Sequence, residues 1–239
     1  MKHFLKPVAL TGMCAGSGLV CLCLRQWLLS TSIDGKGMLT AHPAALLCWL
    51  PVAAVAVALI LLGISRCQYI LVRSPMHCVG TVFRGLGYAA VAIQITGQMQ
   101  GASDTAVCVL AAAAALCCIV EAWLLFQNKK VSSLLHLPGI LFFIVYLLLC
   151  YQQWSGETEL QRYCFQLLAS VGLMFTVYHK ALLAEKVGSS TRYLVFSRAA
   201  LFFCISAIPG SSNGILYGAM AVSVMFDGCA ILAKPVREE

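Results

Sequence analysis

The stretch TAVCVLAAAAALCCIVEAWLLF, residues Thr105–Phe126, decides the fold class, because it is almost entirely apolar and carries one charged residue, Glu121. At 1.5 Å per residue a helix over this stretch is about 33 Å long, enough to cross the hydrocarbon core of a bilayer. The stretch therefore predicts a transmembrane helix that holds an acidic side chain inside the membrane.

Runs of the same kind occur along the whole chain. Charged residues make up 10% of the 239 residues and hydrophobic residues 61%, with a mean hydropathy of +0.88. A soluble domain carries about 25% charged residues, so most of this chain must face lipid. We predict an all-α polytopic transmembrane helix bundle, one membrane domain over residues 1–239. About eight helices are expected, at Pro7–Leu28, Ala44–Ser65, Cys78–Gln98, Thr105–Phe126, His136–Tyr151, Leu160–Leu183, Tyr193–Ile208 and Gly214–Ala233.

The last two runs leave an alternative open. They are short and are joined by the turn-rich segment Pro209–Gly214. A re-entrant hairpin would fit them as well as two full crossings would, and it would leave the C-terminus on the same side.

Basic residues predict the orientation. With eight crossings, five basic segments fall on one side, while the other side holds Lys36, with Arg25 and Arg162 at its border. Since basic residues favour the cytoplasmic side, we predict a plasma-membrane protein with both termini in the cytoplasm. The net charge of +7 is then topological, and no nucleic-acid partner is expected. The five segments carry Lys2, Lys6, Arg66, Arg73, Lys129, Lys130, Lys180, Lys186, Arg192, Lys234 and Arg237.

Four charged residues within the predicted helices are the sharpest functional signal. Arg84, Glu121, Arg198 and Asp227 all fall about 9–12 Å below the cytoplasmic boundary. Each costs on the order of 3 kcal/mol to place near the membrane centre, so we expect both arginines to meet the two acids. Such a cluster is either a structural clasp or a site for a solute or a proton.

One face of the third predicted helix supports the second interpretation. The face is small or polar along its whole length, so it either packs closely or lines a wet path. Tyr88 on the same helix is a further candidate for the polar cluster. The face comprises Gly80, Arg84, Gly87, Val91, Gln94 and Gln98.

The order of several features suggests an internal repeat. The pair Gln26-Trp27, then Arg84, then Glu121 is followed by Gln153-Trp154, Arg198 and Asp227. Two parallel four-helix units, residues 1–130 and 131–239, would place equivalent residues around an axis along the membrane normal.

Other motifs carry weaker signals. His77, His136 and His179 all fall at cytoplasmic helix ends and are weak candidates for a metal site, but their spacing is not that of metal ligands. The 13 cysteines lie mostly in apolar runs, and we expect no bound metal and no cofactor. The pairs Gly12/Gly16 and Gly214/Gly218 match the spacing of close helix packing and could support a homodimer.

The N-terminal fifth carries a resemblance. Arg25-Gln26-Trp27 together with the loop Asp34–Pro43 resembles the start of uncharacterised bacterial multi-pass membrane proteins. The resemblance implies a bacterial plasma-membrane location and no particular activity.

Three functional hypotheses follow. The first is a small-solute permease or transport component, with its site between the four charged residues and Gln94. The second is a non-transporting membrane scaffold or accessory subunit in which the charges form a clasp. The third is an intramembrane enzyme that uses the histidines. Besides the lipid bilayer, a small-molecule solute is the partner expected under the first hypothesis.

Overall fold

The computed structural model describes residues 7–31, 47–64, 68–71, 75–97, 101–154, 160–229 and 231–234. Within these ranges the chain forms eight α-helices, which confirms the predicted all-α bundle. A short 3₁₀ turn, Ser133–His136, leads into the fifth helix. The helices are α1 Pro7–Thr31, α2 Trp49–Ile64, α3 Pro75–Thr96, α4 Ala102–Phe126, α5 Leu137–Trp154, α6 Leu160–Ala184, α7 Ser190–Ala207 and α8 Gly214–Cys229.

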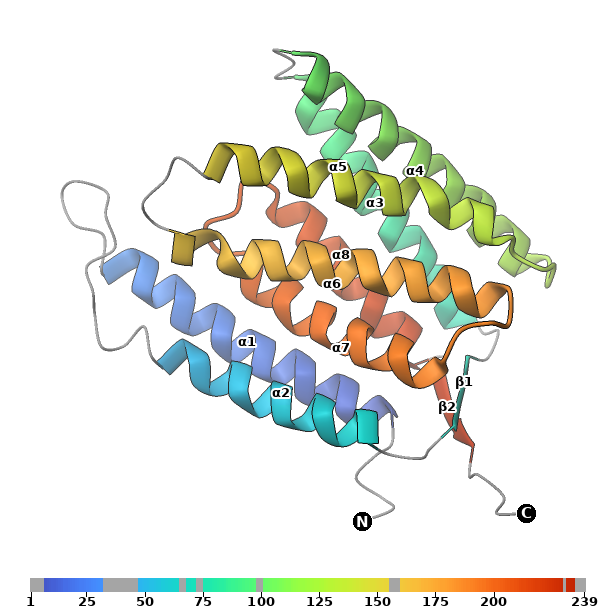
Figure 1. Ribbon diagram of the computed structural model, residues 1–239, viewed down its shortest axis with the longest axis horizontal. Coiled ribbons are helices and arrows are strands. Elements are labelled where there is room, and N and C mark those ends of the chain that lie inside the picture. Colours follow the sequence, from blue (N-terminus) through green and yellow to red (C-terminus); the bar gives the residue numbers. More distant parts are fainter. Residues whose placement is uncertain are drawn as a thin grey trace.

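Six of the helices form a closed ring. Each helix from α3 to α7 packs against the next one in the chain, and α8 packs back against α3. The helices α1 and α2 lie outside this ring, mainly against α7 (Figure 1). Because consecutive helices are neighbours, most of the bundle is built from short connections between antiparallel helices.

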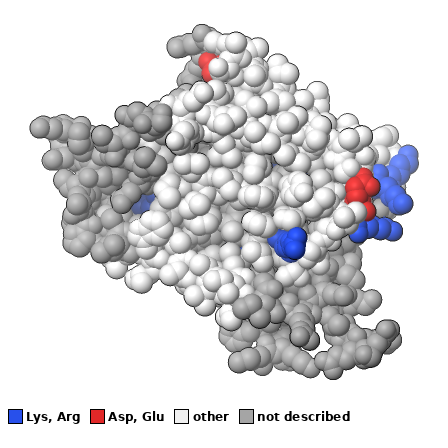
Figure 2. Space-filling view, viewed as in Figure 1, with Lys and Arg blue, Asp and Glu red and all other residues white. Residues whose placement is uncertain are grey.

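The outward-facing side chains show that the helices are surrounded by lipid. Five described helices, α1, α3, α4, α5 and α6, are long and apolar enough to cross a membrane by length and composition. Large apolar side chains face outward along the bundle, including Ile93 and Phe126, which are 74% and 80% exposed. Figure 2 shows a described surface that is largely uncharged, with most of its basic side chains gathered at one end of the molecule. The chain is therefore a multi-pass membrane protein.

The helix α7 is more polar than the other helices of the bundle, because it is surrounded by them. It lies between α1, α2, α6 and α8, so most of its residues are buried. It therefore tolerates Ser197, Arg198 and Ser206, which a lipid-facing helix would not. Both α7 and α8 run between the same two ends of the bundle as the longer helices do (Figure 1), an arrangement that favours two crossings over the re-entrant hairpin.

One part of the sequence interpretation was wrong. The eighth helix was expected to reach Ala233, but α8 ends at Cys229, and Ile231–Lys234 forms a strand, β2. This strand pairs antiparallel with β1, Gln68–Leu71, with Gln68 opposite Lys234 and Leu71 opposite Ile231. A short apolar stretch such as Ile231–Ala233 at the end of a helical run cannot be distinguished from one more helical turn by its periodicity, and neither strand was predicted.

Smaller differences concern the helix ends. The third helix begins three residues earlier than expected, at Pro75, and the second is shorter, beginning at Trp49. Proline at the first position of α3 has no amide hydrogen to leave unpaired and has a φ angle suited to a helix start. The turn after α7 places Gly210 at a φ of +73°, a conformation that favours glycine.

Candidate functional site

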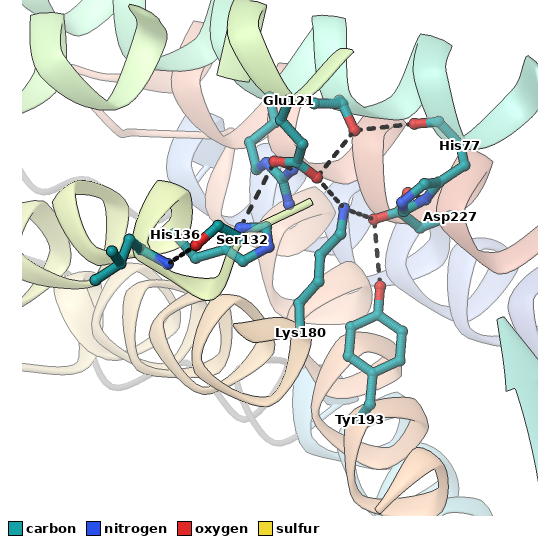
Figure 3. Close-up of polar contacts among 10 residues, drawn as sticks. His77, Glu121, Ser132, His136, Lys180, Tyr193 and Asp227 are labelled. Atoms are coloured by element: carbon teal, nitrogen blue, oxygen red, sulfur yellow. Dashed lines mark hydrogen bonds and ion pairs between the residues drawn. The ribbon is translucent and has the colours of Figure 1, made fainter. Parts of the chain in front are cut away.

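A network of buried polar side chains lies at the end of the ring where α3, α5 and α7 begin. Every helix of the ring, or the turn leading into it, supplies at least one member (Figure 3). All the members are buried. The ion network, as we call it, comprises His77, Thr81 and Arg84 from α3, Glu121 from α4, His136 from the turn before α5, Lys180 from α6, Tyr193 from α7 and Asp227 from α8.

Glu121 is held by two cations. Its Oε2 accepts a hydrogen bond of 2.6 Å from Nη2 of Arg84, and its Oε1 lies 3.3 Å from Nζ of Lys180. The Thr81 hydroxyl lies 3.5 Å from Oε1, and Nδ1 of His136 lies 3.6 Å from Oε2. The last distance is too long for a hydrogen bond, so His136 acts on Glu121 through charge alone when it is protonated.

Asp227 has three partners. Its Oδ1 lies 2.7 Å from Nδ1 of His77, and its Oδ2 accepts hydrogen bonds from Nζ of Lys180 at 3.1 Å and from the Tyr193 hydroxyl at 3.2 Å. All four side chains are buried. These contacts tie α3, α6, α7 and α8 to one carboxylate.

Lys180 joins the two halves of the network. Its ammonium group lies within salt-bridge distance of both Glu121 and Asp227 (Figure 3). With neutral histidines, the two carboxylates balance the charges of Arg84 and Lys180. The network is then neutral, and protonation of either histidine adds one positive charge.

The close approach of α3 and α8 is possible because of a glycine. A Cβ atom on Gly80 would lie 2.9 Å from the carbonyl oxygen of Ser223 and 3.1 Å from Oδ1 of Asp227. Gly87, two turns further along α3, faces α8 in the same way, with Ala219 and Leu216 as neighbours. The small face of the third helix is thus used for close packing against α8.

The expectation that both arginines meet an acid was half right. Arg84 pairs with Glu121 as predicted. The prediction for Arg198 was wrong, because its three guanidinium nitrogens have no hydrogen-bond partner among the described residues, although its side chain is fully buried. Arg198 points to the seam between α8 and α1, beside Gly228 and Thr11, and Lys180 takes the place that it was expected to fill.

The other candidates from the third helix lie elsewhere. Gln94 donates a hydrogen bond to the carbonyl oxygen of Ser212 at the opposite end of the bundle. Tyr88 lies in the ring interior, with its ring against Phe142 and its hydroxyl beside Gly139, and that hydroxyl has no hydrogen-bond partner among the described groups. Gln98 is outside the described residues.

Two of the three histidines belong to the network. His77 and His136 each face a carboxylate, whereas His179 stacks on Phe196 with 5.0 Å between ring centroids. The convergence of all three on which the enzyme hypothesis depended does not occur. Within the described residues, no group of three or more His, Cys, Asp or Glu side chains is arranged to hold a metal ion.

The sequence interpretation missed Lys180, which had been counted as a loop charge. The helix α6 continues to Ala184, and Lys180 extends a buried face formed by Ala169, Leu173 and Val177 at steps of four and three. That spacing was the available signal. Thr81 and Tyr193 carry no comparable signal, because a single hydroxyl on a helix is common.

The internal repeat and the homodimer stay predictions. Arg84 and Arg198, which the repeat pairs, have different surroundings in the structure. Gly12 and Gly16 are exposed, with open space where a Cβ atom would lie, whereas Gly214 packs near Ile208 of the same chain. The Asp34–Pro43 loop, which carries much of the N-terminal resemblance, is outside the described residues.

Fold and site together define a multi-pass membrane protein with an ion network buried inside a ring of helices. No family model matches the chain, and neither the curated proteins nor the solved structures contain a significant match to it.

Proposed function

We propose that the protein is a small-solute permease or a component of a transport system, and that the ion network is its proton-responsive gate. The observation that carries the proposal is that every helix of the ring, or the turn leading into it, contributes a side chain to one buried polar network. A movement that opens the ring at this end must break some of these contacts, so ring opening and network charge are coupled.

The cost of the network supports a functional role. Replacing buried ion pairs by apolar residues of similar volume is often neutral or stabilising, so such a network is weak evidence for a purely structural role. Ionisable residues within a membrane protein are functional candidates by default. A network of this size costs more free energy than an apolar contact that holds helices together would, but its charges can change, as a switch requires.

The acid–histidine pairs supply a means of switching. Chains of acidic and histidine side chains carry protons in membrane pumps and transporters, and His77 and His136 each face a carboxylate of the network. A proton that enters either pair changes the charge that Lys180 faces. The pH on the accessible side can therefore bias the ring between closed and open arrangements.

We further propose that the network end faces the cytoplasm of a bacterial cell and that both termini lie there. The exposed residues Lys129, Lys130, Lys186 and Arg192 occur at this end, in the connections after α4 and α6 and at the start of α7. Basic residues in short loops favour the cytoplasmic side.

Labelling of single cysteines in a cysteine-depleted background tests this orientation. A cysteine at position 130 should react with a membrane-impermeant maleimide only after the cells are opened, and a cysteine at Ser103, at the opposite end, should react in intact cells. Reaction at position 130 in intact cells would reverse the orientation.

A specific observation favours the alternative, a non-transporting scaffold or accessory subunit. Each carboxylate of the network has at least two cationic or hydroxyl partners, and the side chains of Arg84 and Glu121 are only 6% and 2% exposed. A closed and nearly dry network of this kind can also serve as a permanent clasp. The two functions differ in whether the ring ever opens.

Distance measurements on spin-labelled protein separate the two. Labels at Lys129 and Val187, both exposed beyond the network ends of α4 and α6, report the width of the ring in lipid nanodiscs. A gate predicts a second distance population that grows when the pH is lowered from 8 to 5, and a loss of that response in Glu121→Gln. A single unchanging distance at every pH would reject the gate and leave the scaffold.

Flux into proteoliposomes under an imposed pH gradient tests transport itself. The probes are radiolabelled alanine, glucose, acetate and tetraethylammonium, which represent four classes of small solute. Uptake of at least one of them should depend on the pH gradient, fall at least tenfold in Asp227→Asn and persist in Asp104→Asn, a control at the opposite end. A pH-independent ring together with no uptake would overturn the proposal.

A further inference from the structure

Arg198 is a buried charged side chain of the described residues that lies outside the ion network. It lies in the middle of α7 and is fully buried, and its Nε, Nη1 and Nη2 atoms have no hydrogen-bond partner among the described residues. A buried charged group without a partner carries the full cost of leaving water. Arg198 therefore needs a counter-charge that the surrounding side chains do not supply.

Arg25, the other buried arginine outside the network, provides a contrast. Its guanidinium group donates a hydrogen bond to the carbonyl oxygen of Ser206 and lies over the ring of Phe165, 4.5 Å from the centroid. A buried arginine in this protein is thus normally satisfied by its neighbours, and the isolation of Arg198 is specific to its position.

The guanidinium group of Arg198 packs directly against Gly228, beside Thr11. A Cβ atom on Gly228 would lie 2.7 Å from Nη2 of Arg198, 2.8 Å from Nη1 and 2.9 Å from Oγ1 of Thr11. Two guanidinium nitrogens and the Thr11 hydroxyl therefore lie together against the backbone of Gly228, where any side chain would displace them. Guanidinium N–H groups are strong donors to an anion.

Asp227 does not serve as the counter-charge. It precedes Gly228 on α8, and consecutive residues on a helix point about 100° apart. The Asp227 carboxylate is turned into the ring, where His77, Lys180 and Tyr193 hold it. Arg198 lies on the other face of α8, toward α1.

The number of buried charges also shows that Arg198 lacks a counter-charge. The buried charges at this end of the bundle are Arg84, Lys180 and Arg198 against Glu121 and Asp227. With neutral histidines one positive charge is left over, and it belongs to Arg198. A single monovalent anion would balance it.

We propose that Arg198, Thr11 and Gly228 form a binding site for a small monovalent anion, a carboxylate or a halide, between α1, α7 and α8. The guanidinium fork supplies two parallel N–H donors of the geometry that suits a carboxylate, and Thr11 lies beside this fork. This site does not depend on transport and shares no residue with the ion network, so its failure would leave the proposed function standing.

Thermal unfolding of the full chain in detergent tests the site. Sodium acetate and sodium chloride are each titrated against sodium gluconate, a bulky anion, at constant ionic strength. A ligand that binds only the folded state raises the melting temperature with its concentration, by about 5 °C at a hundredfold excess over its dissociation constant. The wild-type protein should show this saturable rise with acetate, chloride or both.

Two variants remove the site in different ways. Gly228→Ala places a methyl group against the tip of the Arg198 side chain and the Thr11 hydroxyl and displaces them, whereas Arg198→Gln removes the charge. Both should abolish the rise. The matched controls, Gly218→Ala on the same helix with open space around its Cβ position, and Arg192→Gln at the exposed start of α7, should keep it.

Arg198→Met decides between the site and a merely unpaired charge. If no anion binds, removing the isolated charge raises the melting temperature equally in all three salts. If an anion binds, the variant is less stable than the wild type in the binding salt. A flat wild-type titration, or stabilisation by phosphatidylglycerol but not by either small anion, would overturn the proposal.

Discussion

Removal of Lys180 is the most informative single change to the ion network. Its ammonium group lies 3.3 Å from one carboxylate oxygen of Glu121 and 3.1 Å from one of Asp227. At an effective dielectric constant of about 20, each contact has a gross Coulomb energy of about 5 kcal/mol. Lys180→Met removes both contacts and leaves two carboxylates with Arg84 as the only permanent cation of the network.

The net loss of stability is smaller than the gross figure for two reasons. The substitution also removes the cost of burying the ammonium group, which is several kcal/mol. In addition, a carboxylate without its cation can take up a proton, which for an ordinary carboxyl group at pH 7 costs about 4 kcal/mol. The cost of this proton uptake is the largest loss of stability that the substitution can cause. We therefore expect the free energy of unfolding to fall by about 3–4 kcal/mol at pH 7.

Because the folded Lys180→Met variant takes up this proton, its loss of stability should depend on pH. Between about pH 4 and 7 the folded variant holds one more proton than its unfolded state, so its stability rises as the pH falls. The deficit relative to the wild type should shrink by about 1.4 kcal/mol per pH unit. It should be about 1 kcal/mol at pH 5.

Reversible unfolding in mixed micelles, measured at pH 7 and pH 5, checks both values. Lys186→Met, at an exposed lysine just beyond α6, is the matched control and should change stability by less than about 0.5 kcal/mol. The double variant Lys180→Met/Asp227→Asn rebalances the charges and should recover at least ~1.5 kcal/mol. A deficit below about 0.5 kcal/mol at pH 7, or one that does not change with pH, would refute the bridging role of Lys180.

Two further predictions concern packing and the surface. Gly80→Ala should destabilise the protein by about 1–3 kcal/mol, because its Cβ would press on the backbone of α8. Gly12→Ala, where the Cβ position is open, should be neutral or slightly stabilising. Melting temperatures in detergent compare the two variants. Hydrogen bonds from the side chain and the amide of Ser133 hold the pKa of Glu185 below its usual range, so Glu185 stabilises the fold above its unfolded pKa and loses this effect as the pH falls through its folded pKa. Glu185→Gln should therefore lower the melting temperature at pH 7 but not at pH 3, and an equal difference at both values would contradict this linkage.

The sequence could predict how deep each charged side chain lies within the membrane, but not toward which neighbouring helix it points. Hydropathy fixed the helix count, and the cost of burying charge predicted the pair between Arg84 and Glu121. Arg198 shares that depth, yet it faces α1 and not the ring interior. Which neighbour a side chain meets depends on how each helix is rotated in the packed bundle, and a single sequence does not determine that rotation.

Lys180 illustrates a second limit. A lysine near a helix end satisfies two rules at once, because it can mark the cytoplasmic side or extend a buried face. Counting it for topology removed it from the list of site residues. The strand β2 was hidden for a similar reason, since Ile231–Ala233 continues the apolar run of α8 up to Lys234.

The pairing of β1 with β2, and of α3 with α8, has a consequence for biogenesis. A ribosome delivers α3 and α4 to the membrane long before α8 exists, so the first half of the ring must wait with an open side. Arg84 and Glu121 can neutralise each other within the α3–α4 hairpin during this interval, because both belong to it. The carboxylate of Asp227 arrives last, and the β2 strand that follows it then pairs with the segment before α3. Ring closure therefore cannot precede the synthesis of α8, and a nascent chain truncated before α8 should be recognised as incomplete by membrane quality control.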